Sequence, residues 1–297
     1  MRSLKQAKSS RHSSIRWAHE IGCLAGIEAR PIRRGRWTAR EKLARAVNEG
    51  VGTLDVAVRR ATALSVMLSV VLIAAVAPAS PAVAADEYLR GIDVSHWQGR
   101  IRWANVKSDG VQFVVAKATE GRTFLDDQYA RNRRLTRRHG LPFTAYHFAR
   151  PDRTRNDALR EANHFVRRAD LRGYHLLPVL DLEVHGGLGR KALIRWTKQW
   201  LRRVEAHLGV KPMIYTSPSF WRERMGNTTW FAENGYELWI AHWHTDTPRM
   251  PAANWGSAGW TLWQTSDCGQ VAGIDGCVDL DVYNGSDIDP LLIRNRR

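Results

Sequence analysis

Cysteine is scarce in this chain, with three residues among 297. Cys23 lies in an amino-terminal segment that we set apart from the fold, which leaves Cys268 and Cys277 as a pair in the remainder. An even pair in a domain that we argue below to be exported favours a disulfide over a metal site. The short loop between the two residues contains three glycines, which suits a turn that joins two strands and is held by the bond.

Several motifs that would define other functions are missing as well. The chain has no internal repeat, no glycine-rich phosphate loop and no nucleic-acid-binding motif, and its basic residues fall on predicted helix faces. His147, His242 and His244 show no metal-ligand spacing supported by a third ligand. We therefore predict no cofactor, no bound metal and no nucleic-acid partner.

A long uncharged run occurs in one place, residues 61–77, directly after two arginines and shortly before small residues at 82–85. A basic flank, an apolar stretch and a small-residue exit predict a secretory signal segment at 61–85. The run is at the lower edge of the roughly 17–25 residues needed to span a bilayer, so a retained signal anchor is the alternative. Residues 1–60 make a long basic leader, which we expect to be disordered or to precede the true translation start.

The remaining residues, 86–297, are predicted to form one catalytic domain. The leader and signal segment hold 14 of the 45 basic and 5 of the 29 acidic residues, so this domain has a net charge of about +7 rather than +16. Such a charge favours a negatively charged partner through long-range attraction. The alternative is that the basic residues only form a solvated surface.

Short apolar runs ended by turn residues predict eight strands in this domain. Apolar residues at helical spacing predict helices at 126–138, 156–169 and 191–208. Strands and helices alternate for about five units, and three strands follow without long helices. We therefore predict an α/β fold, a single incomplete TIM-like barrel with its active site at the carboxyl ends of the strands. The predicted strands are Gly91–Trp97, Phe113–Thr119, Phe143–Phe148, Leu176–Glu183, Met213–Thr216, Leu238–Trp243, Thr261–Gln264 and Val278–Val282.

Four acidic residues occur in or at the ends of these strands. Asp93 lies in the first strand and Asp279 in the last, and these two strands become neighbours when a barrel closes. The fourth predicted strand ends on Asp181 and Glu183. Residues two apart in a strand share a face, so these two carboxyl groups would lie about 6–7 Å apart.

Two carboxyl groups this close raise the pKa of one of them and keep it protonated near neutral pH. An acid beside a carboxylate can cleave a glycosidic bond, because the acid protonates the leaving oxygen and the carboxylate stabilises the developing positive charge. Strand-end caps or a Mg²⁺ or Ca²⁺ site are the alternatives. Aromatic residues accompany the acids, and their faces stack on sugar rings, so we favour a carbohydrate. They are Trp97, Tyr146, Tyr215, Trp239, Trp243 and Trp263.

Eight stretches of the domain resemble glycoside hydrolase family 25, the lysozymes of the Chalaropsis type. They occur in order over nearly all of residues 86–297, whereas residues 1–85 have no counterpart. The stretches are Gly-Ile-Asp-Val-Ser-His-Trp-Gln-Gly (91–99), Phe-Val-Val-Ala-Lys-Ala-Thr-Glu-Gly (113–121), Ala-Tyr-His-Phe-Ala-Arg-Pro (145–151), Pro-Val-Leu-Asp-Leu-Glu (178–183), Ile-Tyr-Thr-Ser (214–217), Leu-Trp-Ile-Ala-His-Trp (238–243), Leu-Trp-Gln (262–264) and Val-Asp-Leu-Asp (278–281).

The resemblance implies an incomplete α/β barrel that hydrolyses the β-1,4 bond between N-acetylmuramic acid and N-acetylglucosamine in peptidoglycan. It implies that Glu183 is the general acid and that Asp181 is its partner, which orients the N-acetyl group of the substrate or positions water. Asp93 and Asp279 are implied as supporting acids. Substrate contacts are expected at Tyr146, Tyr215, Trp239, Trp97, Trp243 and Gln264.

Where the family often has Asn, this chain has Asp281, which we expect to face outward. The stereochemistry stays open among retention, inversion and assistance by the acetamido group of the substrate. A non-catalytic peptidoglycan- or chitin-binding module, a chitinase-like glycosidase and a metal-dependent hydrolase are the alternatives. We expect a secreted monomer that acts on peptidoglycan strands and has no stable membrane association after cleavage.

Overall fold

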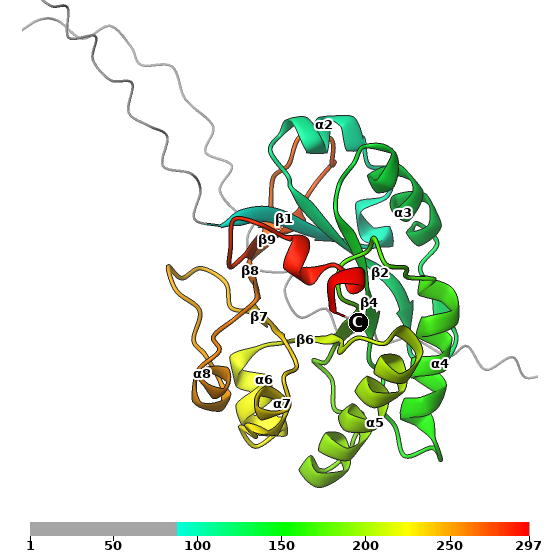
Figure 1. Cartoon of the computed structure of the whole chain (residues 1–297), viewed down its shortest axis with the longest axis vertical. Helices are drawn as coiled ribbons and strands as arrows, with labels where there is room; N and C mark the ends of the chain where they lie inside the picture. Colours follow the sequence, from blue (N-terminus) through cyan, green and yellow to red (C-terminus); the bar gives the residue numbers. More distant parts are fainter. Residues whose placement is uncertain (1–87, 297) are drawn as a thin grey trace, which may run out of the picture. The chain divides into compact units, whose positions relative to one another are not determined.

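The computed structural model describes residues 88–296, in which eight strands close into a barrel (Figure 1). Seven of them run parallel, and β9 is antiparallel to both of its neighbours, β8 and β1. Because β1 also pairs with β2, the ring is closed, and the predicted α/β barrel is confirmed. The barrel strands are β1 (Leu89–Val94), β2 (Phe113–Glu120), β4 (Phe143–Phe148), β5 (Val179–Asp181), β6 (Met213–Thr216), β7 (Leu238–Ala241), β8 (Leu262–Gly269) and β9 (Val278–Tyr283), and β3 (Phe124–Leu125) pairs with β2.

Helices lie outside the barrel between successive strands (Figure 1). Five strand–helix units come first, and β7, β8 and β9 follow, with a short turn of left-handed backbone, α8 (Ala252–Gly256), between β7 and β8. The helices are α2 (Trp103–Ser108), α3 (Tyr129–Arg138), α4 (Asp157–Ala169), α5 (Arg190–Leu208), α6 (Pro218–Arg224) and α7 (Trp230–Glu233), with 3-10 turns η1 (His96–Gln98), η2 (Asp289–Leu291) and η3 (Ile293–Arg296).

The helices α4 and α5 pack on the barrel through their apolar faces. Phe165 on α4 and Trp200 on α5 are fully buried, with ring centres 5.5 Å apart. Both rings contact His147 on β4, at 5.9 and 5.4 Å, and this contact keeps water from the outer side of the strand. Successive residues of a strand point to opposite faces, so Tyr146 and Phe148 of the same strand point into the barrel.

A glycine lets the first two strands approach closely. Gly91 on β1 pairs with Phe113 on β2, and an added Cβ at position 91 would lie 2.2 Å from the Phe113 ring. Phe113 is fully buried and has no room to move aside. A larger residue at position 91 would therefore displace β1 and with it Asp93, which lies two residues further along the same face.

Cys268 in β8 and Cys277 just before β9 form a disulfide, as the sequence predicts. The closed loop lies next to Asp279, so the bond restrains the start of the strand that carries this acid. In the chain-entropy picture, a loop this short contributes on the order of 2–3 kcal/mol to stability.

The predicted leader and signal segment, 1–60 and 61–85, lie outside the described residues. Among residues 88–296, none of the helices has the length and apolar character that crossing a membrane would require.

Candidate active site

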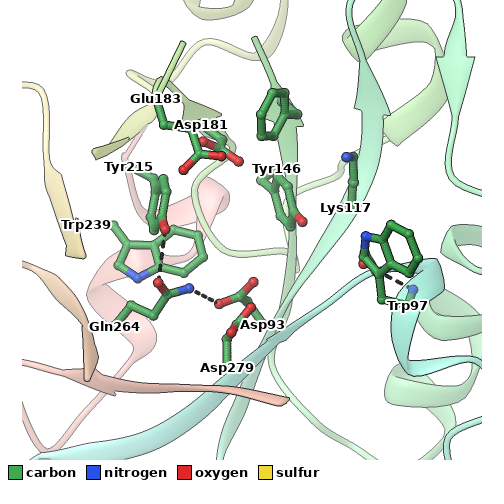
Figure 2. Close-up of a pocket in the computed structure, with 12 residues that line it drawn as sticks. Asp93, Trp97, Lys117, Tyr146, Asp181, Glu183, Tyr215, Trp239, Gln264 and Asp279 are labelled. Atoms are coloured by element: carbon green, nitrogen blue, oxygen red, sulfur yellow. Dashed lines mark hydrogen bonds between the residues drawn. The ribbon is translucent and has the colours of Figure 1, made fainter. Parts of the chain in front are cut away.

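A pocket of about 180 Å³ opens where the carboxyl ends of the parallel strands meet. Each of the eight barrel strands contributes at least one side chain to its wall. The four acids selected from the sequence all lie in this wall, so the fold brings them together (Figure 2). The wall consists of Asp93, Ser95, Trp97, Lys117, Tyr146, Phe148, Asp181, Glu183, Tyr215, Trp239, Gln264 and Asp279.

Asp181 is the last residue of β5, and Glu183 follows two residues later. The backbone here is held from both sides: the N–H of Ala149 donates to the Asp181 carbonyl oxygen at 2.9 Å, and the N–H of Leu182 donates to the Tyr215 carbonyl oxygen at 3.0 Å. Neighbouring strands therefore fix the place of both acids. Figure 2 shows their carboxyl groups lying together on one side of the pocket.

The two carboxyl groups differ in their surroundings. Asp181 is 6% exposed, and its Oδ1 has no hydrogen-bond partner within the described residues. Burial raises the pKa of Asp181 well above its usual value, and the charge of Glu183 raises it further. Glu183 is exposed at the pocket, but its carboxyl group is still partly desolvated by the surrounding protein, which raises its pKa. The positive charges of Lys117 and Arg150 oppose this shift. Because the two groups interact, they take up and lose protons as a pair, and each keeps its proton to a higher pH than a free carboxyl group.

Lys117 on β2 is a site residue to which sequence reasoning gave no role. It is 8% exposed, and its Nζ lies 2.6 Å from Oε2 of Glu120 and 4.7 Å from the ring centre of Phe148. Glu120 also accepts a hydrogen bond from Nε of Arg150 at 2.7 Å. The signal in the sequence was a single charged residue inside the apolar run 113–118, which a strand buried on both sides would not contain without a partner.

A second group of carboxyls lies on the opposite side of the pocket (Figure 2). Asp93 on β1 and Asp279 on β9 are paired across the two strands, and Asp281 also lies within hydrogen-bonding reach of Asp93. Burial raises the pKa of Asp93 to about 6, that of Asp279 to about 10 and that of Asp281 well above its usual value. Three carboxyl groups this close do not ionise together, so the group keeps protons at neutral pH.

The expectation that Asp281 faces outward is wrong. Its side chain is 2% exposed, and Nε1 of Trp239 donates to its Oδ1 at 2.9 Å. Strand β9 continues in register with β1 as far as Tyr283, so Asp281 points to the same side as Asp279. The error came from placing the end of the strand too close to Asp281.

Gln264 on β8 connects several predicted site residues. Its Oε1 accepts hydrogen bonds from the Tyr215 hydroxyl and from Nε1 of Trp243, both at 2.9 Å. Two donors at Oε1 fix the orientation of the amide, so Nε2 donates to Oδ2 of Asp93 at 2.6 Å. This bond lowers the pKa of Asp93 and opposes the effect of burial. Trp243, which is not in the pocket wall, therefore acts on the site through Gln264.

The aromatic side chains divide into two groups. Trp97, Tyr146, Tyr215 and Trp239 lie in the pocket wall, and Trp97 is 80% exposed beside the opening. Trp263 is 7% exposed and lies outside the pocket wall, and its Nε1 donates to a backbone carbonyl oxygen at 2.8 Å. The structure thus places four of the six aromatic residues in the pocket wall, where Trp97 is largely exposed and Tyr215 and Trp239 are buried.

In the part of the chain that the structure describes, residues 88–296, no three His, Cys, Asp or Glu side chains are arranged to hold a metal ion. His147 is buried between the Thr119 hydroxyl and Oε2 of Glu161, each 2.8 Å from a ring nitrogen. Both ring nitrogens of His147 thus have a hydrogen-bond partner, so His147 has a structural role behind the pocket.

A closed α/β barrel with paired carboxyl groups and aromatic side chains at the carboxyl ends of its strands is the architecture of a glycoside hydrolase. Residues 92–274 match the family "Glycosyl hydrolases family 25", and the chain belongs to this family.

Named relatives agree with this assignment. "Lysozyme M1" of Streptomyces globisporus is 36% identical over 216 residues, which cover 70% of this chain and 71% of the relative. An "N,O-diacetylmuramidase" of Chalaropsis sp is 31% identical over 207 residues, which cover 64% of this chain and 96% of the relative. The solved structure of the bacterial lysozyme from Streptomyces coelicolor matches with a TM-score of 0.65 and 33% identity, covering 70% of this chain and 98% of the other. The resemblance predicted from the sequence is confirmed.

Proposed function

We propose that this chain is a muramidase that hydrolyses the β-1,4 bond between N-acetylmuramic acid and N-acetylglucosamine in peptidoglycan. The observation that carries the proposal is the interacting pair Asp181 and Glu183 in a pocket walled by aromatic side chains. Relatives named as lysozyme and muramidase support the class of substrate.

In this proposal Glu183 is the general acid. Its carboxyl group is exposed to the pocket, where the glycosidic oxygen would lie, and its raised pKa favours a protonated form. It donates its proton to the leaving oxygen as the bond from that oxygen to the anomeric carbon breaks.

Asp181 is the partner that receives the acetamido group of the substrate. Its buried Oδ1, unpartnered within the described residues, can accept the acetamido N–H, and a donor at this atom favours the ionised form of Asp181. Glu183 then carries the proton that the pair retains. The acetamido oxygen attacks the anomeric carbon, and the Asp181 carboxylate stabilises the resulting positive charge. Water opens this intermediate and returns a proton to Glu183.

The other site residues hold the substrate or the acids. Asp93 and Asp279 support the pocket wall opposite the catalytic pair, and Gln264 keeps Asp93 in place with help from Trp243. We assign the sugar contacts to the aromatic side chains of the wall, which are Trp97, Tyr146, Tyr215 and Trp239.

The test is mass spectrometry of the products from purified peptidoglycan, with the reducing ends identified. We expect muropeptides that end in reducing N-acetylmuramic acid, formed equally with and without a chelator, and formed about 10²–10⁴-fold more slowly by the Glu183→Gln variant. Reducing N-acetylglucosamine, activity lost on chelation, or binding without products would each contradict the proposal. Equal cleavage of chitin oligosaccharides would favour a chitinase.

We also propose that residues 86–297 are the catalytic domain of an exported enzyme that works as a monomer and leaves the membrane after cleavage. The sequence of the segment 61–85 supports export. Amino-terminal sequencing of the protein from culture supernatant should begin near Ala85 or Asp86. Recovery of the intact chain in the membrane fraction would show a retained anchor.

A further inference from the structure

A second cleft, of about 260 Å³, lies outside the barrel between α3, the end of α4 and the loop that leads to β5. The Tyr129 hydroxyl on α3 donates to the carbonyl oxygen of Ala169 at the end of α4, at 2.7 Å, and joins the two helices at this place. Four of the seven lining residues are arginines, and none is acidic. The lining residues are Tyr129, Ala130, Arg133, Arg134, Arg137, Arg168 and Tyr174.

The positive charge of this arginine cleft is compensated only in part. Asp170 pairs with Arg133 at 3.0 Å and with Arg172, which is not in the lining, at 2.9 Å. Within residues 88–296, Arg134, Arg137 and Arg168 form no ion pair with an acid. Three guanidinium groups around one cleft can therefore bind a negatively charged ligand.

Arg137 is held in position without an acid. Its guanidinium lies 4.8 Å from the ring centre of Tyr174, and Nη1 donates to the Tyr174 hydroxyl at 3.2 Å. The ring of His175 also lies beside the Tyr174 ring, with ring centres 4.2 Å apart. A side chain fixed in this way loses less rotamer entropy when it binds a ligand.

The cations come from both walls of the cleft. Arg133 and Arg137 are one helical turn apart on α3, about 5–6 Å between their Cβ atoms, and Arg168 is in the last turn of α4. A cation in the last turn of a helix also stabilises that helix, which is sufficient to explain Arg137 in α3 and Arg168 in α4. The helix dipole does not explain why Arg133 and Arg134 line the same cleft. Charges repeated along two walls fit a chain with repeated negative groups better than one small anion.

Two other polyanions fit less well. Single-stranded nucleic acid binds by stacking its bases on free aromatic faces, but the Tyr174 ring is already in contact with Arg137 and His175. A membrane surface is held by apolar side chains beside the cations. Of the large exposed apolar side chains in the described region, Tyr174 is the one that lines this cleft.

We propose that the arginine cleft binds the phosphodiester groups of an anionic polymer attached to the bacterial cell wall. The planar guanidinium group matches the paired oxygens of a phosphate. Because Arg137 and Arg168 lie in the last turns of helices that run back along the barrel, the cleft is toward the amino ends of the strands, away from the pocket. The enzyme would be held on the wall while the pocket stays free. This inference rests on the proposed function, which makes the wall the place of action.

The experiment measures binding directly and in the Glu183→Gln background, so that hydrolysis does not enter. The probes are soluble poly(glycerol phosphate) and, as a carboxylate polymer, polyglutamate, titrated calorimetrically at about 0.1 M salt. The test variant is Arg134→Ala/Arg168→Ala, since both residues are exposed and unpaired within residues 88–296. The matched control is Arg160→Ala/Arg167→Ala, which removes the same charge from exposed positions of α4 outside the cleft.

We expect the test variant to weaken binding of poly(glycerol phosphate) by about tenfold or more, because two charge-assisted contacts are lost. The control should stay within about twofold. The test variant in the active background should cleave a small soluble muropeptide substrate at the unmodified rate. Equal losses in test and control, equal binding of polyglutamate, or tighter binding to phosphatidylglycerol vesicles would each overturn the proposal. A failed proposed function would show instead as absent muropeptide cleavage.

Discussion

Burial raises the pKa of Asp281 well above its usual value, which favours the protonated form of its carboxyl group. Nε1 of Trp239 donates to Oδ1, so this oxygen acts as an acceptor. Oδ2 is buried and has no other partner within the described residues, and Asp93 is within reach. A proton on Oδ2 allows Asp281 to donate to Asp93, while Gln264 donates to Asp93 from the other side. Asp281 then acts as a neutral hydrogen-bond donor, a role that an asparagine can also fill.

This assignment predicts different results for two substitutions. Asp281→Asn keeps an acceptor for Trp239 and a donor for Asp93, so kcat/KM should stay within about threefold of the unmodified enzyme. Asp281→Leu leaves the Trp239 N–H unpaired and removes the donor, at a cost of about 1–3 kcal/mol for each buried group. Activity should then fall at least about tenfold.

The measurement for Asp281 is kcat/KM between pH 4 and 8, with melting temperatures to show that each variant is folded. Asp287→Asn, at an exposed acid, is the control substitution. If the enzyme needs a negative charge at position 281, the Asn variant will be as inactive as the Leu variant, and the assignment is wrong.

At the level of elements, β4 and α4 are joined by a buried titratable pair behind the pocket. Burial raises the pKa of Glu161 from 4.5 to about 7 and lowers that of His147 from 6.5 to about 3. In the folded protein the pair therefore holds one proton from about pH 3 to pH 7. In the unfolded chain the pKa of His147 is 6.5 and that of Glu161 is 4.5, so the pair also holds one proton between pH 4.5 and pH 6.5. Equal proton numbers mean that the pair gives no pH dependence in that window.

Removing the acid should expose the pH dependence of the histidine. In Glu161→Gln, His147 stays neutral in the fold but binds a proton when unfolded below about pH 6.5, so the unfolded state gains protons as the pH falls. Relative to the unmodified protein, stability should fall from pH 6.5 to 4.5 by up to about 1.4 kcal/mol per pH unit. Thermal unfolding at several pH values measures this slope. Glu223→Gln, at an exposed position, is the control, and parallel curves for both variants would refute the account.

The strands were predictable as elements, and their boundaries less so. The apolar run 176–183 predicted one strand, but β5 spans Val179–Asp181. Leu176 instead forms an isolated bridge with Leu292, and the N–H of Leu177 donates to the Leu291 carbonyl oxygen. Leu176 and Leu177 are therefore apolar because a distant carboxyl-terminal segment buries them, and not because they belong to the strand. The short helices α2, α6 and α7 were not predicted, because helices this short do not display a clear period of 3.6 residues.

For the molecule as a whole, the barrel topology explains how much of the site could be predicted. Parallel strands carry their carboxyl ends to one rim, so the acids that end predicted strands had to meet. The inward positions of Lys117 and Asp281 could not be derived in this way. Lys117 lies next to a register shift between β2 and β4, and Asp281 depends on how far β9 continues. The inward positions of both residues depend on how the strands pair, and a local sequence pattern holds no information on strand pairing.

The central claim is that Asp181 and Glu183 act as one catalytic unit. Glu183→Gln should reduce turnover of peptidoglycan by about 10²–10⁴-fold with the fold intact, because it removes the proton donor. Asp181→Asn should also be severe, and the basic limb of its pH profile should shift to lower pH. In the substrate complex the ionised Asp181 would raise the pKa of Glu183, and the variant lacks that charge.

The most direct measurement is therefore the turnover of both single variants and the double variant on the same peptidoglycan, with Glu223→Gln as a control. If the two residues act as a unit, the double variant will be little slower than the slower single variant. Multiplied losses in the double variant would show independent roles. Turnover equal to that of the unmodified enzyme in either single variant would contradict the account and direct attention to Asp93 and Asp279.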